Sequence, residues 1–260
     1  YSLGVHLQGR FPTRIQKIDS NNVVGVAEGS DPALRSEAIV FTAHWDHLGE
    51  GRAVLGDSIY NGAADNATGC ALLLELARAF ATSPRTARSQ LFIATTLEEN
   101  GLLGSEYYAA HPRFPLEQTV GGINMDAVNL FGPTKTMEMT GIGKTTLEDD
   151  LARELAKQDR SLRPDPNAVV GFYFRSDHFP FAKRGVPFVF AGSGWELEEK
   201  KAPNTRDPQL GTRFHQPSDE WTPALDFDAA ARDLRIYYEV GRTLSDSTAW
   251  PEWKPGAEWK

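Results

Sequence analysis

The feature that most constrains the fold is a repeated alternation of short apolar runs with longer segments of helical character. The short runs have the length and composition of buried strands and cover residues 38–43, 90–96, 120–125 and 186–191. Helical segments cover residues 68–80, 102–110, 145–158 and 227–244. Strand followed by helix, repeated, is typical of a mostly parallel sheet with helices on both faces. We therefore predict a three-layer α/β fold, in which one sheet lies between two layers of helices.

Composition excludes several classes of function. The chain has 27 basic and 35 acidic residues and a formal net charge of -8, whereas a protein that binds the phosphate backbone needs a surplus of Lys and Arg. No apolar run approaches the roughly 20 residues that cross a bilayer. We therefore expect neither a nucleic acid nor a membrane as partner. Cys70 is the single cysteine, so no intramolecular disulfide can form.

Polar residues lie at two points between the run at residues 38–43 and the apolar helix at residues 68–80. His44 and Asp46 come directly after the run, and a His-x-Asp triplet suits a divalent metal because one residue can bind while the other holds it. Asp65 precedes the helix among small residues that allow close approach of the backbone to a ligand. The alternatives are ordinary loop residues for the triplet and a helix N-cap for Asp65.

Further acidic and histidine residues follow the other predicted strands. Glu98 and Glu99 come after residues 90–96, and because neighbours in extended chain point to opposite sides, one can bind metal while the other handles a proton. Asp126 ends the run at residues 120–125, where an unpaired carboxylate would be costly to bury. His215 lies in a later loop, with Asp219 as a partner that could support it. A solvated acidic turn is the alternative for the glutamate pair.

Five motifs in this order resemble the M28-type dinuclear zinc aminopeptidases: TAHWDHLG, NGAADNATG, LEENGLLGS, NMD and HQPSDE. The match spans His44 to Asp219. The resemblance implies that His44 and Asp126 bind one zinc ion and that Glu99 and His215 bind the other. Asp65 would bridge the two ions. It also implies that Asp46 orients His44, and that Ser176, Asp177 and His178 form a segment beside the substrate.

The resemblance implies a metal-dependent exopeptidase that hydrolyses N-terminal peptide bonds by a metal-bound hydroxide, with Glu98 as general base. The cofactors would be two Zn²⁺ ions, or other divalent ions in the same sites, and the substrate a peptide with a free N-terminus. It implies a mixed, mostly parallel sheet flanked by helices. We interpret residues 1–260 as one peptidase domain, with residues 1–37 as the remnant beside an inserted domain that is trimmed or absent. We expect a secreted or periplasmic protein rather than a cytoplasmic one.

The chain departs from the family pattern at the residue before His215. Some relatives have a tyrosine there that can donate to the oxyanion, but this chain has Phe214, which has no donor. Tyr173 is the predicted substitute, with a core position as the alternative. His47 is expected to be solvated or to support a ligand, because the family pattern uses His44. Trp195 and Trp221 are candidates for the rim of the cleft.

The sequence leaves two alternative functions open. A glutaminyl cyclase shares the architecture but uses one zinc ion, and the Asp65–Asn66 and Glu98–Glu99 pairs favour the dinuclear peptidases. A binding domain that has lost its ligands is the other alternative, although all five ligand positions and Glu98 are present. The aromatic residues Phe172, Phe174, Phe179, Phe181, Phe188 and Phe190 have strand-like spacing and are expected in the core, with a pocket for an apolar side chain as the alternative.

Overall fold

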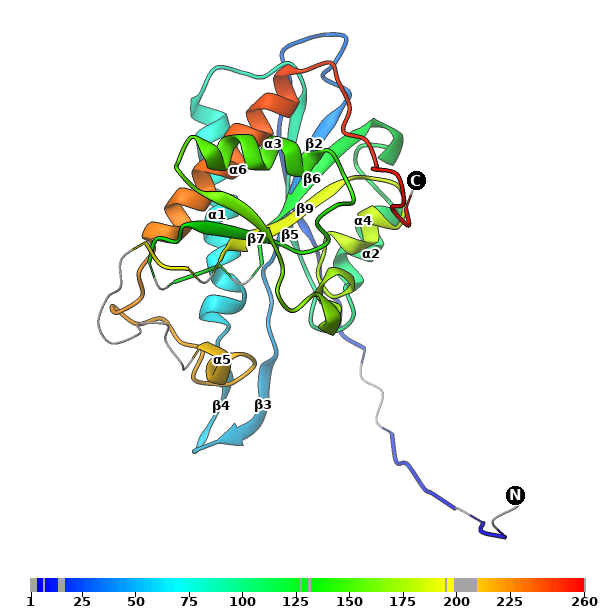
Figure 1. Cartoon of the computed structure of the whole chain (residues 1–260). Helices are drawn as coiled ribbons and strands as arrows, with labels where there is room; N and C mark the ends of the chain where they lie inside the picture. Colours follow the sequence, from blue (N-terminus) through cyan, green and yellow to red (C-terminus); the bar gives the residue numbers. More distant parts are fainter. Residues whose placement is uncertain are drawn as a thin grey trace.

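The computed structural model describes residues 4–6, 8–13, 17–126, 128–130, 132–194, 196–198 and 210–259, with side chains from residue 212 in the last range. A sheet of seven strands forms the centre of the described part (Figure 1). Its order is β1-β5-β2-β6-β9-β7-β8. The strands are β1 (Val23–Ala27), β2 (Ala38–His44), β5 (Ser89–Thr95), β6 (Thr119–Asn124), β7 (Thr136–Met139), β8 (Ser161–Pro164) and β9 (Phe188–Ser193).

Strand direction confirms the prediction of a mixed, mostly parallel sheet. The four central strands β5, β2, β6 and β9 are parallel to one another. β1 runs antiparallel to β5, and β7 runs antiparallel to β9 while pairing in parallel with β8. Every residue of β2 and β6 is buried, as expected for strands covered on both faces.

Helices cover both faces of the sheet, so the predicted three-layer architecture is confirmed. On one face, α1 (Thr68–Thr82), α3 (Leu147–Ala156) and α6 (Asp228–Asp246) pack against side chains such as Ile39 and Phe41 of β2. On the other face, α2 (Leu103–Ala110) and α4 (Phe179–Ala182) pack against Ala38 and Val40. The alternation of side chains along β2 separates these two cores.

A short hairpin projects from the layered body near the short helix α5 (Leu210–Arg213) (Figure 1). It consists of β3 (Gly49–Val54) and β4 (Asp57–Tyr60), which pair in antiparallel orientation. The hairpin connects β2 to the turn at Ala63–Ala67 that precedes α1. Among the described residues, no helix combines the length and the apolar character that a bilayer crossing requires.

The parallel strands bring several polar segments to one edge of the sheet. β2 ends at His44, β5 ends just before the Glu98–Glu99 pair, and β6 ends two residues before Asp126. Ligands of open α/β sheets bind beyond the carboxyl ends of the strands. We therefore expect the functional site of this chain at this edge of the sheet.

Candidate metal centre

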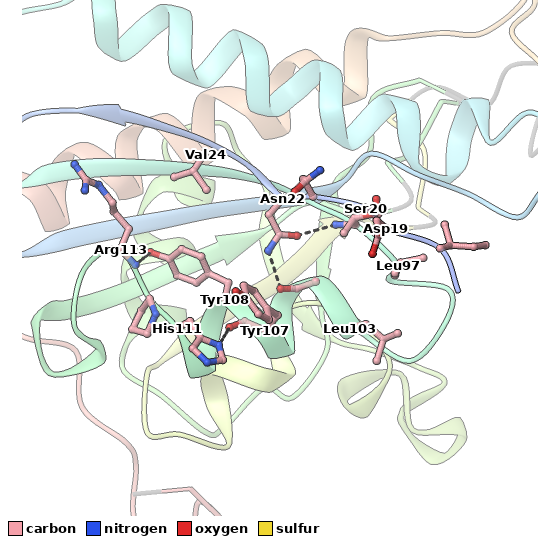
Figure 2. Close-up of a pocket in the computed structure, with 15 residues that line it drawn as sticks. Asp19, Ser20, Asn22, Val24, Leu97, Leu103, Tyr107, Tyr108, His111 and Arg113 are labelled. Atoms are coloured by element: carbon pink, nitrogen blue, oxygen red, sulfur yellow. Dashed lines mark hydrogen bonds between the residues drawn. The ribbon is translucent and has the colours of Figure 1, made fainter. Parts of the chain in front are cut away.

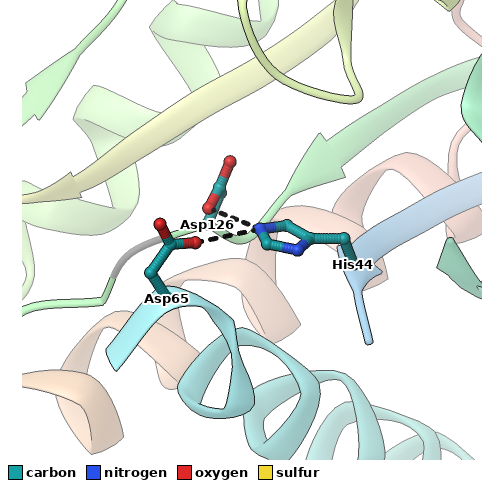
Figure 3. A group of neighbouring side chains, drawn as sticks. All are labelled: His44, Asp65 and Asp126. Carbon is teal, nitrogen blue, oxygen red and sulfur yellow. Dashed lines mark hydrogen bonds and ion pairs between the residues drawn. The ribbon is translucent and has the colours of Figure 1, made fainter. Parts of the chain in front are cut away.

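His44, Asp65 and Asp126 form a compact group at the carboxyl edge of the sheet (Figure 3). His44 Nε2 lies 3.1 Å from Asp65 Oδ1 and 3.2 Å from Asp126 Oδ1. The three side chains come from the end of β2, the turn before α1 and the loop after β6. Burial lowers the pKa of His44, but hydrogen bonds and charge from Asp126 and Asp65 outweigh burial and raise that pKa above its usual value.

A second group forms on the other side of Asp65. His215 Nε2 lies 3.3 Å from Asp65 Oδ2 and 3.0 Å from Glu99 Oε2. The two oxygens of Asp65 therefore face two different histidines, Oδ1 toward His44 and Oδ2 toward His215. This is the arrangement expected of a carboxylate shared between two neighbouring cation sites. The five residues predicted as ligands lie together in the structure.

Buried hydrogen bonds hold the two aspartates in place. Ser176 Oγ donates to Asp126 Oδ2 at 2.5 Å and accepts from Asn124 Nδ2 at 2.7 Å. Asp219 accepts hydrogen bonds from the main-chain N–H groups of Ala64 and Asp65 at 2.9 to 3.1 Å. Asp219 was predicted to support His215. These hydrogen bonds instead connect Asp219 to the main chain at Ala64 and Asp65.

Asp46 contacts His44 as predicted, but through its main-chain carbonyl group and not through its side chain. His44 Nδ1 lies 2.9 Å from the main-chain carbonyl oxygen of Asp46, so this carbonyl, and not the carboxylate, orients the imidazole. The carboxylate instead accepts a hydrogen bond from the main-chain N–H of Leu97 at 2.6 Å. Leu97 immediately precedes Glu98 and Glu99, so Asp46 connects the first histidine to the loop of the glutamate pair.

Glu98 lines the same cavity as the ligand candidates but stands apart from their close contacts. The cavity, of about 130 Å³, is lined by Asp65, Glu98, Glu99 and Asp126, together with residues described below. Burial raises the pKa of Glu98 to about 9, and the negative charge of Asp126 adds to the shift. A buried carboxyl group of this kind can exchange a proton with a group in the cavity.

The donor set fits divalent cations. Imidazole nitrogen and carboxylate oxygen, without thiolate, suit zinc and similar ions. Donor atoms bound to one ion at about 2.0–2.1 Å are separated from one another by about 3 Å, which agrees with the separations of 3.0 to 3.3 Å within the two groups. Three ligand carboxylates packed this closely are costly without positive charge. The residues present therefore fit two cations.

Aromatic side chains and one arginine complete the wall of the cavity. Phe172, Phe190 and Phe214 line it, together with Arg175 and Ser176. The Arg175 guanidinium stacks over the Phe172 ring, 5.5 Å from its centroid. The sequence did not indicate Arg175, because a single arginine beside a recognised motif is not distinctive.

Tyr173 is placed away from this wall. Its buried ring packs against His178 and Phe179, and Lys144 lies over its face. Burial raises the pKa of Tyr173 to about 12, with a contribution from the negative charge of Glu258 near the C-terminus. Its predicted role as a donor to the substrate finds no support in this geometry.

The predicted aromatic core is only partly confirmed. Phe181 and Phe188 are buried in the core beside α2 and α4, as expected. Phe172 and Phe190 line the cavity, and Phe174 is exposed. In the segment 176–178, Ser176 reaches the cavity while Asp177 and His178 are fully buried. Trp221 is exposed, and Trp195 lies outside the described residues.

A larger cavity, of about 690 Å³, is lined by Thr96 and Leu97, which precede Glu98, and by residues of α2 (Figure 2). Its wall includes Ser20 and Asn22, which are hydrogen-bonded to Thr96 and Gly104, and the rings of Tyr107 and Tyr108. Asp19 and His111 are the acidic and imidazole side chains among its described lining. Size therefore does not locate the chemistry, because the convergent carboxylates and histidines line the smaller cavity.

The fold and the site together define an α/β protein with a carboxylate and histidine centre suited to two divalent cations. The chain belongs to Peptidase family M28, whose family model matches residues 22–238. No curated protein sequence matches the chain.

Solved structures share the fold at low sequence identity. An aminopeptidase from Aneurinibacillus sp. strain AM-1 is 22% identical, with a TM-score of 0.62, over 91% of this chain and 48% of its own. The zinc aminopeptidase BSAP from Bacillus subtilis is 21% identical, with a TM-score of 0.65, over 88% of this chain and 51% of its own. The present chain thus spans about half the length of these relatives. A Porphyromonas gingivalis glutaminyl cyclase is 17% identical, with a TM-score of 0.55, over 86% of this chain and 75% of its own.

Proposed function

We propose that the chain is a zinc-dependent aminopeptidase that holds two divalent cations and hydrolyses the N-terminal bond of a peptide. The observation that carries the proposal is the position of Asp65, whose two oxygens face His44 on one side and His215 on the other. Membership of Peptidase family M28 supports the hydrolysis of peptide bonds. The likeness to solved aminopeptidases supports action at a free N-terminus.

His44, Asp65 and Asp126 would hold one cation, and Asp65, Glu99 and His215 the other. When bound, the cations would polarise the carbonyl group of the scissile bond and make a water molecule acidic. Asp46 and Asp219 keep the donor atoms in place through the main-chain contacts described above.

Glu98 would move the proton. With the cations bound, their positive charge would keep Glu98 in its carboxylate form. This carboxylate would accept a proton from the attacking water as the new C–O bond forms, and would donate it to the nitrogen as the C–N bond breaks. The products are a free N-terminal amino acid and the shortened peptide. Glu98 suits this exchange because it is buried at the cavity without a close contact to His44 or His215.

The cavity can receive a free amino terminus. Its described lining brings together four acidic residues and one arginine, Arg175. A free α-amino group would donate hydrogen bonds to a carboxylate oxygen of this lining, and the aromatic side chains Phe172, Phe190 and Phe214 offer an apolar surface to the adjoining side chain. Blocking the amine should therefore remove the substrate from the cavity.

The test uses metal-free protein, with and without added zinc, and aminoacyl-p-nitroanilides with free or acetylated amines. We expect p-nitroaniline release only with zinc and only from free amines. Equal cleavage of acetylated substrates would show that a free N-terminus is not recognised. Failure to cleave any of the panel would favour a binding domain. Release of ammonia from peptides with N-terminal Gln, in place of hydrolysis, would identify a cyclase.

A further inference from the structure

Arg175 brings positive charge to a cavity wall made mostly of acidic and aromatic side chains. The described lining holds four carboxylates and three phenylalanines besides Arg175, Ser176 and His215. Within the described part of the chain, the Arg175 side chain makes no ion pair and no hydrogen bond. A guanidinium has five N–H donors and stays protonated in proteins. This group is therefore available to a bound molecule that carries negative charge.

A short turn holds the guanidinium at the wall. The turn η4 (Phe172–Phe174) ends before Arg175, whose main-chain N–H donates to the Phe172 carbonyl oxygen at 3.0 Å. The guanidinium lies over the Phe172 ring, 5.5 Å from its centroid. On the other side, the buried Ser176 is fixed by its hydrogen bond to Asp126. A guanidinium that is already stacked loses less freedom when it binds a ligand.

The two kinds of charge in the wall suit the two ends of a short substrate. Carboxylate oxygens accept hydrogen bonds from a free amino group, whereas a guanidinium binds a carboxylate through two parallel hydrogen bonds and repels an ammonium group. With the amino group and the scissile carbonyl beside the ligand carboxylates, Arg175 is left to the part of the substrate that follows the scissile bond.

The length of the substrate decides whether its terminal carboxylate lies in this part. In a dipeptide, the carboxylate follows the scissile bond after one residue. Each additional residue moves it away by up to about 3.3–3.6 Å. The cavity, of about 130 Å³, is small for a ligand site. A dipeptide therefore fits the wall better than a longer peptide does.

We propose that Arg175 binds the C-terminal carboxylate of a dipeptide, which makes dipeptides the preferred substrates. This inference rests on the proposed peptidase function and adds a substrate class to it. The carboxylate is not altered by the reaction, so its contact with Arg175 is the same before and during hydrolysis. Loss of the contact should therefore raise KM more than it lowers kcat.

The test compares three substrates, Leu-Ala, its C-terminal amide and Leu-Asp amide, on the zinc-loaded protein. The third substrate carries its carboxylate on a side chain and not at the terminus. The variants are Arg175→Gln and Arg175→Lys, with Arg235→Gln as the control because Arg235 is exposed on α6. Lysine keeps the charge but cannot form the two parallel hydrogen bonds.

We expect the wild type and Arg235→Gln to favour Leu-Ala over its amide by about 10- to 100-fold in kcat/KM, mainly through KM. Arg175→Gln should lose this preference and cleave the amide as the wild type does, and Arg175→Lys should keep part of it. The same preference in Arg175→Gln as in the wild type would overturn the proposal. So would faster cleavage of Leu-Asp amide than of Leu-Ala, because the carboxylate would then come from a side chain. Cleavage of none of the three by the wild type would instead refute the proposed function.

Binding without turnover tests the inference on the wild type alone. The probes are an analogue of Leu-Ala in which CH₂–NH replaces the scissile amide, and the C-terminal amide of that analogue. Calorimetry should show at least 10-fold tighter binding of the analogue with the free carboxylate. Equal affinities would overturn the proposal even if the Arg175 variants did not fold.

Discussion

Asp219 holds the main chain of Asp65 from 154 residues further along the sequence, because its Oδ2 accepts the Asp65 N–H at 3.1 Å. Asp219→Ala would leave the buried N–H groups of Ala64 and Asp65 without this acceptor. We expect a loss of about 1–3 kcal/mol in the free energy of unfolding and a decrease of about 10- to 100-fold in metal affinity. Denaturant unfolding and calorimetry measure the two effects.

Asp219→Asn keeps one acceptor oxygen and should lie between the wild type and Asp219→Ala. Glu239→Ala, an exposed change on α6, serves as control. Unchanged metal affinity in Asp219→Ala would show that the position of Asp65 does not depend on Asp219.

Glu98 and Glu99 are adjacent but should have separable effects. Glu98→Gln removes the proton acceptor and should lower kcat by about 100- to 10,000-fold with metal affinity retained. Glu99→Gln should weaken the binding of one cation, because Glu99 Oε2 faces His215 at 3.0 Å. Peptidase rate and metal stoichiometry are to be measured on both variants. Full activity in Glu98→Gln would contradict the assignment of the base.

The sequence predicted which residues form the site, but it did not predict all the contacts that these residues make. His44, Asp65, Glu99, Asp126 and His215 all follow recognisable strand ends or motifs, and the structure brings them together. The roles of Asp46 and Asp219 differ from prediction because they involve main-chain N–H and C=O groups. Residue types do not reveal which main-chain group will lie nearby.

The fold shows the same division between strong and weak signals. The four buried strands and four longest helices were predicted with boundaries within about two residues, because apolar periodicity is strong in them. The hairpin β3–β4 and the pair β7–β8 were not predicted. β3 is exposed throughout, and β8 is four residues long and ends at Pro164, so neither has an apolar pattern.

A buried ion pair attaches α6 to the far edge of the sheet. Arg160 Nη1 lies 2.8 Å from Asp233 Oδ1, with both side chains 1% exposed, and Asp233 Oδ2 accepts from the Ser193 main chain at 2.8 Å. Asp233→Ala leaves the Arg160 charge buried and should cost about 3–5 kcal/mol in the free energy of unfolding.

Arg153→Ala, which breaks the exposed pair of Arg153 with Asp150, should cost less than about 1 kcal/mol. Denaturant unfolding of both variants provides the comparison. Equal losses in the two variants would refute the importance assigned to burial.

His178 should make the fold sensitive to acid. Burial lowers the pKa of His178 to about 3, below the usual value of 6.5, so the folded state binds fewer protons at this residue than the unfolded state. The stability is fully present above about pH 6.5 and decreases as the pH falls toward 3. From pH 8 to pH 5 we expect His178 to account for a loss of about 2 kcal/mol.

His178→Leu should remove this part of the pH dependence, because leucine binds no proton. The measurement is the free energy of unfolding at pH 8 and pH 5 in metal-free wild type and variant. The difference between the two pH values should be about 2 kcal/mol smaller in the variant. An identical difference in both proteins would show that His178 does not titrate between the folded and unfolded states.

The central claim is that Asp65 lies between two cations. Anomalous diffraction at the zinc edge, from crystals grown with zinc, tests it most directly. We expect two peaks, one in contact with His44 and Asp126 and the other with Glu99 and His215, with one oxygen of Asp65 toward each. A single peak, or two peaks of which neither contacts Asp65, would contradict the account.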